Sequence, residues 1–122
     1  FVCSPDHELH LRNDVSLQEL SRLNVVLPGI TLTGRILNAL FAKNGLNLTG
    51  SMTTNYLETI KMMVSIGLGW SVLPKTMAEG LEIIHVPDVY LERKLGVIEH
   101  SSRHTSNAAR AFKTLLASET LT

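Results

Sequence analysis

The apolar run "MMVSIGLGWSVLP", residues 62–74, constrains the fold more than any other stretch of this 122-residue sequence. It continues a pattern of apolar residues at helical spacing that starts just after Asn55, a residue type common at helix beginnings. Gly67 and Gly69 then interrupt the pattern, and a short apolar segment follows. Glycine often ends a helix because it adopts a left-handed backbone without a steric penalty. The run therefore predicts a helix ending near Gly67 and a buried strand at 70–73.

Strands and helices alternate along the rest of the chain in the same way. The segment "NVVLPG", residues 24–29, predicts a strand, and a helix with one apolar face follows it until Gly45. The alternation of apolar and polar residues at 46–52 predicts another strand. Further elements are predicted as strands at 1–3, 82–86 and 94–98, a turn of helix at 75–79, and helices capped by Ser16 and Ser106. This order predicts an α/β fold with a largely parallel sheet. We expect the last helix to pack on this sheet through the face that contains Phe112.

The composition excludes several classes of protein. Eleven Lys and Arg residues balance eleven Asp and Glu residues, and the charges are scattered, so the chain alone offers no basic surface for nucleic acid. The interrupted run at 62–74 is shorter than the roughly 18 apolar residues that a membrane span requires, and the N-terminus lacks the features of a signal peptide. A single cysteine, Cys3, cannot form an internal disulfide. We therefore expect one cytoplasmic domain with no membrane partner.

A glycine pair in an apolar segment raises the question of a cofactor site. A dinucleotide-binding loop needs the pattern Gly-x-Gly-x-x-Gly between a strand and a helix, so that the helix N-terminus meets the pyrophosphate. Here Gly67 and Gly69 follow a predicted helix and precede a predicted strand, and Val72 occupies the third glycine position. We expect no cofactor and interpret the pair as a helix end and a tight connection.

Metal binding and catalysis have equally little support in the sequence. The pairs His7 with His10 and His100 with His104 have no carboxylate or thiol placed to complete a metal shell. The Gly-x-Ser-x-Gly motif of serine hydrolases is absent from the sequence. Cys3 in an apolar strand is typical of a small core residue, the alternative being a redox-sensitive thiol. We expect no metal site and no enzymatic activity.

Hydroxyl and amide side chains gather where predicted strands pass into loops and helices. They come from three segments, "SPDH", "GITLTGR" and "SMTTN". Free N–H groups at a helix beginning, joined by such side chains, suit a carboxylate or another small anion, although plain helix capping uses the same residue types. In open α/β sheets ligands bind at the carboxyl ends of the strands, where we expect the three segments to converge. The candidate binding residues are Ser4, Thr31, Thr33, Thr53, Thr54 and Asn55.

Five segments together resemble the effector-binding domain of LysR-type transcriptional regulators. Four of them are "FVCSPDHELH", "VSLQEL", "TGR" at a helix start and "SNAARAF". The most specific is "ETIKMMVSIGLGWSVLP", which is similar to the family's helix, Val-x-x-Gly-x-Gly turn and strand ending in proline. Glu8 stands where the family usually has proline, which is a change in a loop. The resemblance covers essentially the whole chain.

The resemblance implies a periplasmic-binding-protein type 2 fold, in which a small metabolite binds between two subdomains and shifts the orientation of paired subunits. By position, 1–99 would form the second, Rossmann-like subdomain with the two crossing strands at its ends, and 100–122 a helix of the first subdomain. The family's DNA-binding domain, linker helix and most of the first subdomain would precede Phe1.

The partners that the resemblance implies are a small anionic effector and further copies of the chain, in a dimer or tetramer. DNA would be contacted only through the N-terminal domain that this sequence does not include. The six candidate residues would then form part of the effector site.

Two other functions remain open on the sequence. A solute-binding protein of a transporter would have the same fold, and the upstream sequence would separate the two, because a regulator carries a helix-turn-helix and a transport component a secretion signal. An enzyme on this two-lobed fold would need a titratable group with a perturbed pKa in the cleft, and the sequence points to none.

Overall fold

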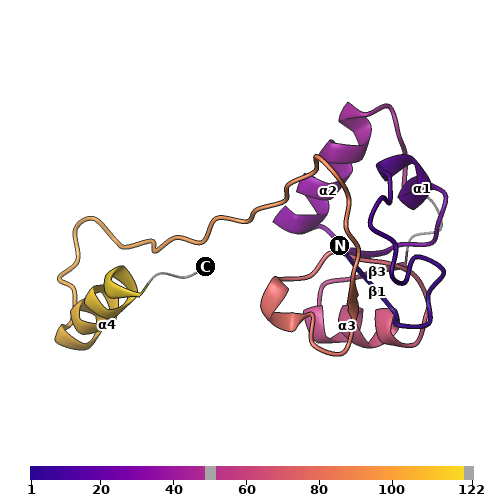
Figure 1. Cartoon of the computed structure of the whole chain (residues 1–122). Helices are drawn as coiled ribbons and strands as arrows, with labels where there is room; N and C mark the ends of the chain where they lie inside the picture. The colour runs from indigo at the N-terminus through magenta and orange to yellow at the C-terminus, as the bar shows by residue number, and fades with distance from the viewer. Residues whose placement is uncertain (49–51, 120–122) are drawn as a thin grey trace.

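The computed structural model of the chain describes residues 1–48 and 52–119 (Figure 1). Short strands and helices alternate at the N-terminal side, and a long segment without regular structure leads to a last helix. The elements are β1 (Val2–Cys3), α1 (Leu17–Ser21), β2 (Val26–Pro28), α2 (Leu32–Lys43), β3 (Met52–Thr54), α3 (Leu57–Ser65), the 3₁₀ turn η1 (Lys75–Met77), β4 (Glu82–Ile83) and α4 (Asn107–Ser118). The predicted mixture of strands and helices is confirmed.

Trp70 and Ser71 join two short β-ladders into one array. β2 and β3 are parallel neighbours, whereas β1 and β4 are antiparallel neighbours. Trp70 bridges Val25 in the parallel sense, and Ser71 exchanges two backbone hydrogen bonds of 2.8 and 3.0 Å with Val2 in the antiparallel sense. The spatial order is therefore β4, β1, the Trp70–Ser71 segment, β2 and β3. The strand predicted at 70–73 is reduced to two bridging residues because its neighbours β1 and β2 are themselves only two and three residues long.

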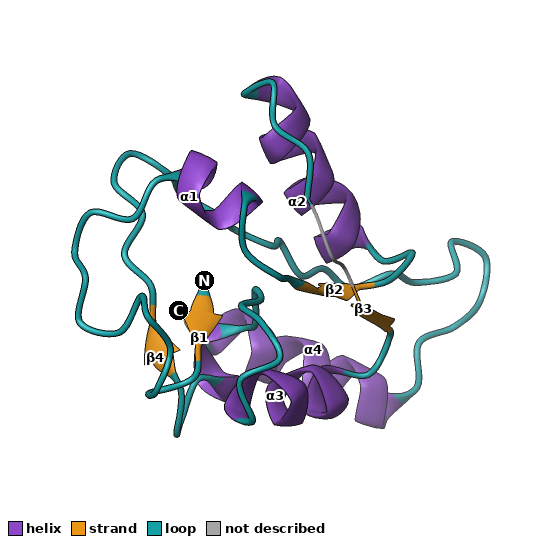
Figure 2. Cartoon of the chain, turned by 90° about the vertical axis from the view of Figure 1, so that its right-hand side faces the viewer, coloured by secondary structure: helices purple, strands orange, loops and turns teal. Residues whose placement is uncertain are grey.

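Alternate residues of the strands face two different helix layers. Val25 and Leu27 belong to a core cluster that includes residues of α1 and α2, whereas Val26 belongs to a cluster with Ile60 and Val64 of α3. This two-residue period follows from strand geometry, in which successive side chains point to opposite faces. α1 and α2 lie on one side of the strands and α3 on the other (Figure 2). The N-terminal part of the chain is thus a helix, sheet, helix sandwich.

Trp70 occupies the centre of the larger core cluster. It is fully buried, with its ring centroid 5.8 Å from that of Phe41 and 5.9 Å from that of Phe1. Its Nε1 donates a hydrogen bond of 3.0 Å to the carbonyl oxygen of Leu20, and the buried hydroxyl of Ser71 donates to the Val26 carbonyl at 2.5 Å. Both side chains therefore satisfy their polar atoms while tying the central segment to its neighbours.

The two glycines of the 62–74 run are required for different reasons. Gly67 has a φ of 85° and ends α3, and its N–H donates to the Val64 carbonyl oxygen at 3.0 Å. At Gly69 a Cβ would overlap the carbonyl oxygen of Asn24. The first glycine provides a left-handed backbone, and the second allows the chain to approach the segment before β2 closely. The predicted helix end and tight connection are confirmed.

The third predicted strand lies later in the chain than expected. Residues 46–48 form no strand, residues 49–51 lie outside the described residues, and the observed β3 begins at Met52. Its three residues pair with β2 in register, with Leu27 opposite Thr53. The position of β3 is therefore set by pairing with β2 rather than by the alternating pattern upstream.

Two predicted strands near the end of the chain are shorter or missing. The strand predicted at 82–86 retains only the two residues of β4, because β1 offers it only two partners. The strand predicted at 94–98 is not formed, and Leu95, Val97 and Ile98 are exposed. A strand needs a neighbour for its backbone groups, and within 1–48 and 52–119 nothing pairs with this segment.

The last helix forms where predicted but does not pack on the sheet. Ser106 caps α4, since its Oγ accepts the N–H of Ala109 at 3.1 Å. No described residue of α4 is buried, and Phe112 and Leu115 are 60% and 56% exposed. α4 lies apart from the other elements, at the end of the long segment (Figure 1). The expectation that this face packs on the sheet is wrong for the described part of the chain.

Glu19 completes the capping box predicted at Ser16. Its carboxylate accepts the Ser16 N–H at 2.9 Å and the Arg12 guanidinium at 2.6 Å, while the Ser16 hydroxyl accepts the Glu19 N–H at 3.1 Å. These bonds favour the charged carboxylate and lower the pKa of Glu19 from 4.5 to about 2, the backbone bond from Ser16 being the largest cause. Because the pKa is lower in the folded state, the stability that Glu19 contributes is present above pH 4.5 and is lost as the pH falls toward 2.

We expect Glu19→Gln to reduce the free energy of unfolding at about pH 6, and we expect the deficit to shrink as the pH falls from 4.5 toward 2, where wild type loses the same charge. Urea denaturation across this pH range measures the deficit. Glu58→Gln is the control, since Glu58 is exposed in the first turn of α3. A deficit that stayed constant with pH would contradict a role for the ionised carboxylate.

Candidate functional site

Two segments that follow neighbouring parallel strands meet at one edge of the sheet. Pro28 and Thr54 are opposite each other at the ends of β2 and β3, and the Gly29 N–H donates to the Thr54 carbonyl oxygen at 3.2 Å. The loop residues Gly29–Thr31 and Asn55–Tyr56 therefore lie side by side just before α2 and α3 begin. This is the carboxyl edge of the parallel strands, where ligands collect in α/β proteins. We call it the carboxyl-edge site.

Thr31 holds the beginning of α2 against the end of β2. It is the N-cap of the helix, and its Oγ1 accepts the Gly34 N–H at 3.2 Å and donates to the Pro28 carbonyl oxygen at 2.9 Å. Gly34 approaches so closely that a Cβ would overlap the carbonyl oxygens of Pro28 and Gly29. Thr33 lies in the first turn of α2 and is half-buried. Both predicted threonines thus lie at this edge, and Thr31 has a clear capping role.

Asn55 lies across the edge from Thr31 and contacts the backbone of Gly29. A Cβ at Gly29 would overlap the Oδ1 atom of Asn55, so the amide end of this side chain lies directly against the Gly29 backbone and would have to turn away from a larger residue. Thr54 Oγ1 accepts the Tyr56 N–H at 3.4 Å, and Thr53 is exposed in β3. The predicted site residues Thr53, Thr54 and Asn55 therefore lie together beside the beginning of α2.

The predicted role of Asn55 as the cap of α3 is wrong. Tyr56 occupies the N-cap position and makes no side-chain hydrogen bond to the helix. The amide of Asn55 lies over Gly29 instead of turning back to the helix. The first N–H groups of α3 therefore lack a side-chain cap, unlike those of α2, α1 and α4.

Ser4 does not join the other five candidate residues. β1 runs antiparallel to the Trp70–Ser71 segment, so the carboxyl end of β1 lies at the opposite edge of the sheet. Ser4 is buried there, and its Oγ accepts the Asp6 N–H at 3.3 Å. The expectation that all three segments converge is wrong for Ser4, because strand direction depends on pairing that local sequence does not reveal.

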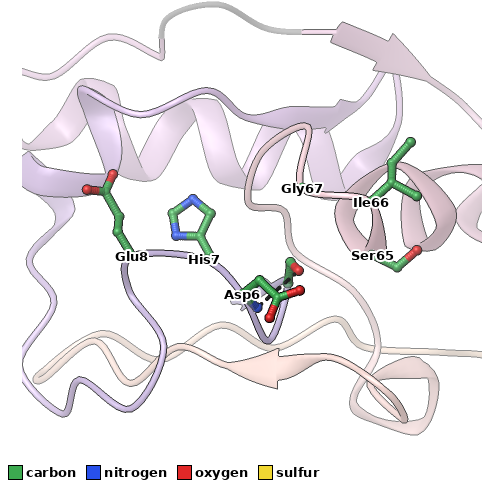
Figure 3. Close-up of a pocket in the computed structure, with 7 residues that line it drawn as sticks. Asp6, His7, Glu8, Ser65, Ile66 and Gly67 are labelled. Atoms are coloured by element: carbon green, nitrogen blue, oxygen red, sulfur yellow. Dashed lines mark hydrogen bonds between the residues drawn. The ribbon is translucent and has the colours of Figure 1, made fainter.

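An open pocket of about 460 Å³ lies at that opposite edge. Its lining residues are Ser4, Asp6, His7, Glu8, Ser65, Ile66 and Gly67 (Figure 3). Asp6 lies apart from Glu8 (Figure 3), and His7 Nδ1 accepts the Leu9 N–H at 3.1 Å. Within the described residues, the hydrogen bonds of the pocket's Ser4 and His7 side chains are to backbone N–H groups of their own loop.

Neither a metal-binding cluster nor an exposed thiol is found among the described residues. Among the residues that the structure describes, no three His, Cys, Asp or Glu side chains gather into a group that could hold a metal ion. Cys3 is buried, and its burial is the main cause that raises the pKa of the thiol, with the charge of Glu82 as a further cause. A thiol of raised pKa is a poor nucleophile, which favours the core interpretation over the redox-sensitive one.

None of the helices in 1–48 and 52–119 combines the length and the apolar character needed to cross a membrane.

Three exposed apolar side chains at the carboxyl-edge site are not part of the sequence prediction. Ile30, Tyr56 and Leu32 are 90%, 75% and 58% exposed. Ile30 stands between Gly29 and Thr31 in a loop that precedes the apolar face of α2. A large apolar residue in such a polar loop is the sequence signal that could have identified it. The site thus combines uncharged polar groups with an apolar rim.

Comparisons with known proteins agree on one family. Residues 1–120 match the family model described as LysR substrate binding domain. No curated protein sequence matches the chain significantly.

Solved structures of regulator domains are similar to the chain in fold. The effector binding domain of QuiR in complex with shikimate has a TM-score of 0.70 and 18% identity, covering 93% of this chain and 56% of that one. The Synechocystis PCC6803 CcmR regulatory domain in complex with 2-PG has a TM-score of 0.69 and 16% identity, covering 94% and 59%. The C-terminal domain of a probable LysR family regulator from Rhodococcus sp. RHA1 has a TM-score of 0.68 and 23% identity, covering 96% and 62%.

The chain thus spans less than two thirds of the length of each of these structures. At such identities the likeness establishes the fold, which is the mixed α/β, periplasmic-binding-protein type 2 fold that the sequence predicts. The match over residues 1–120 shows that the chain belongs to the LysR substrate-binding-domain family, which is a family of regulator ligand-binding domains rather than of enzymes.

Proposed function

We propose that this chain is the effector-sensing part of a bacterial LysR-type transcriptional regulator, in which binding of a small metabolite changes DNA binding through a change of conformation. The single observation that carries the proposal is the family match over residues 1–120. In the whole regulator, DNA is contacted through a separate N-terminal domain, and the chain acts in the cytoplasm without catalysis. This function is favoured over that of a transporter's solute-binding protein because the similar structures are regulator domains.

The carboxyl-edge site is our proposed effector site. The helix beginnings of α2 and α3 lie there beside the hydroxyl and amide groups of Thr31, Thr33, Thr53, Thr54 and Asn55. Helix N-termini favour anions, because their free N–H groups carry partial positive charge. Similar domains bind shikimate and 2-PG. We therefore propose a small anionic effector such as a carboxylate, and Ser4, at the opposite edge of the sheet, lies outside the proposed site.

We further propose that residues 1–99 form the second effector subdomain and that 100–122 belong to the first. The exposed apolar face of α4 supports this division, since Phe112 and Leu115 have no partner within the described part of the chain. An amphipathic helix gains most of its stability by burying its apolar face against another element. We also propose that the whole regulator is a dimer or tetramer, as symmetric assembly lets one effector bias paired subunits.

The effector site can be tested by a nuclear magnetic resonance titration of the isotope-labelled chain with shikimate. We expect the amide signals of Gly29, Thr31, Thr54 and Tyr56 to move. Asn55→Ala is expected to weaken binding about tenfold, which is the effect of one hydrogen bond to a charged group. The titration detects millimolar affinity and locates the contact at the same time.

Asn47→Ala is the matched control, because Asn47 is also exposed but lies just after α2, at the end away from this site. It should leave the affinity unchanged. Signal changes confined to the pocket at Ser4 and Gly67, or equal affinity of wild type and Asn55→Ala, would contradict the proposed site.

A further inference from the structure

Large apolar side chains flank the contact between Gly29 and Asn55 at the carboxyl-edge site. Ile30 follows Gly29 along the chain and Tyr56 follows Asn55, so each of the two loops contributes one of them. The parallel register of β2 with β3 brings the two loops side by side, and both side chains are largely exposed. Pockets for small organic ligands are lined mainly by apolar side chains, with a few polar groups that fix orientation. The edge therefore has the composition of a site for a ligand with an apolar part.

The apolar rim is a gathered patch rather than a single exposed residue. Leu32, the first residue of α2, is exposed two positions beyond Ile30. Single apolar side chains are ordinary on a protein surface, whereas a patch of them beside polar groups marks a surface that binds something. Covering such a patch removes apolar area from water, and the gain grows with the area removed. A ligand with an apolar body therefore gains affinity here that a purely polar anion does not.

Arg35 adds a positive charge close to this rim. Its N–H donates to the Thr31 carbonyl oxygen at 3.0 Å, so Arg35 lies one turn into α2 from the helix beginning. Residues four apart share a helix face, and long side chains on a helix lean toward its N-terminus, so the guanidinium extends toward Thr31. Arg35 is exposed and takes part in no ion pair within residues 1–48 and 52–119. Its charge is therefore available to a ligand.

The two helix beginnings at this edge differ in charge. The first turn of α2 contains no acidic residue, whereas the first turn of α3 contains Glu58. A cation near a helix N-terminus is unfavourable, because the N-terminus already carries partial positive charge. An anion beside Thr31 and Arg35 would offset both charges, while Glu58 already provides a negative charge at α3. Charge complementarity therefore favours a carboxylate on the α2 side of the site.

We propose that the effector is a carboxylate with a compact apolar ring, which pairs with Arg35 at the beginning of α2 and rests its ring on Ile30 and Tyr56. An arginine binds a carboxylate through two parallel N–H donors, which fixes the orientation of the ligand. The exposed ring of Tyr56 offers a surface on which an aromatic ring can stack. This inference rests on the proposed effector function and adds the chemical class of the effector.

Three probes separate the contact with the ring from the contact with the charge. Benzoate has both features, acetate has only the carboxylate, and benzamide has only the ring. Each is titrated into the isotope-labelled chain and followed by nuclear magnetic resonance. We expect benzoate to move the amide signals of Gly29, Thr31 and Arg35. We also expect it to bind about tenfold more tightly than acetate or benzamide, since one apolar group or one charged hydrogen bond is worth about that factor.

Two variants should affect the probes differently. Ile30→Ser removes part of the apolar rim, so the affinity for benzoate should fall about fivefold while that for acetate stays the same. Arg35→Gln removes the charge, so the affinities for benzoate and acetate should both fall about tenfold while that for benzamide stays the same. The matched controls are Ile98→Ser and Arg103→Gln, because both residues are exposed in the long segment before α4. They should bind every probe as wild type does.

The outcomes distinguish this inference from the proposed site on which it rests. Equal affinities for benzoate and acetate, with signal changes at Gly29 and Thr31, would overturn the inference and leave the carboxyl-edge site standing. Equal affinities for benzoate and benzamide, or wild-type benzoate binding by Arg35→Gln, would do the same. Signal changes confined to the pocket at Ser4 and Gly67, or none with any probe, would instead remove the proposed effector site and this inference with it.

Discussion

Trp70→Ala is expected to destabilise the domain by about 3–5 kcal/mol, which is the usual cost of removing a large buried aromatic side chain. The indole is fully buried, stacks on Phe41 and is the hydrogen-bond donor to the Leu20 carbonyl oxygen. Its loss leaves a cavity at the centre of the larger core cluster and removes the link between the central segment and α1. Since Trp70 is the only tryptophan, urea denaturation followed by circular dichroism is the appropriate measurement.

Two variants separate the contributions of volume and hydrogen bonding. Trp70→Phe keeps an aromatic ring but removes the indole donor, and we expect a smaller cost of about 1–3 kcal/mol for the unpaired carbonyl oxygen and lost volume. Phe112→Ala removes an aromatic side chain that is 60% exposed on α4 and should change stability by less than about 0.5 kcal/mol. Equal effects of Trp70→Ala and Phe112→Ala would show that Trp70 is not central to the core.

Gly69→Ala is expected to cost more than Gly67→Ala, although Gly67 is the residue with the unusual backbone angle. A Cβ at Gly69 would overlap the carbonyl group of Asn24, so the backbone segments before Trp70 and before β2 would have to separate, at a cost of about 3 kcal/mol. At Gly67 the φ of 85° disfavours alanine, but a Cβ meets nothing within 4 Å, and the cost should be about 1–2 kcal/mol.

Thermal and urea denaturation of the two variants rank these costs. Gly96→Ala is the control, because Gly96 has open space around it and no positive φ, and its effect should be within about 0.5 kcal/mol. A larger loss of unfolding free energy in Gly67→Ala than in Gly69→Ala would contradict the explanation that Gly69 is needed for close approach to Asn24.

The helix ends and the two-faced pattern of the strands follow from the sequence because they depend on near neighbours in the chain. Ser16 and Glu19 form their capping box within one turn, and Gly67 ends α3 through a bond to Val64 three residues earlier. The alternation of Val25, Val26 and Leu27 between two cores is likewise a property of an extended backbone. Such local signals need no knowledge of the rest of the fold.

The extents of the strands depend on partners far away in the chain. The segment 94–98 has the composition of a strand but remains unpaired, whereas Met52–Thr54 becomes one because β2 lies beside it. α4 forms in the predicted place, yet its apolar face remains exposed, because packing requires a surface that the helix itself does not specify.

The sequence alone determined the family, the alternation of strands and helices, and the chemical character of the candidate site, since each rests on residue types and short spacings. Only the tertiary structure decided which residues share that site. The parallel pairing of β2 with β3 brings Thr31, Thr54 and Asn55 to one edge, and the antiparallel direction of β1 takes Ser4 to the other. Strand direction results from long-range backbone pairing, so it cannot be read from the short segments that carry the site residues.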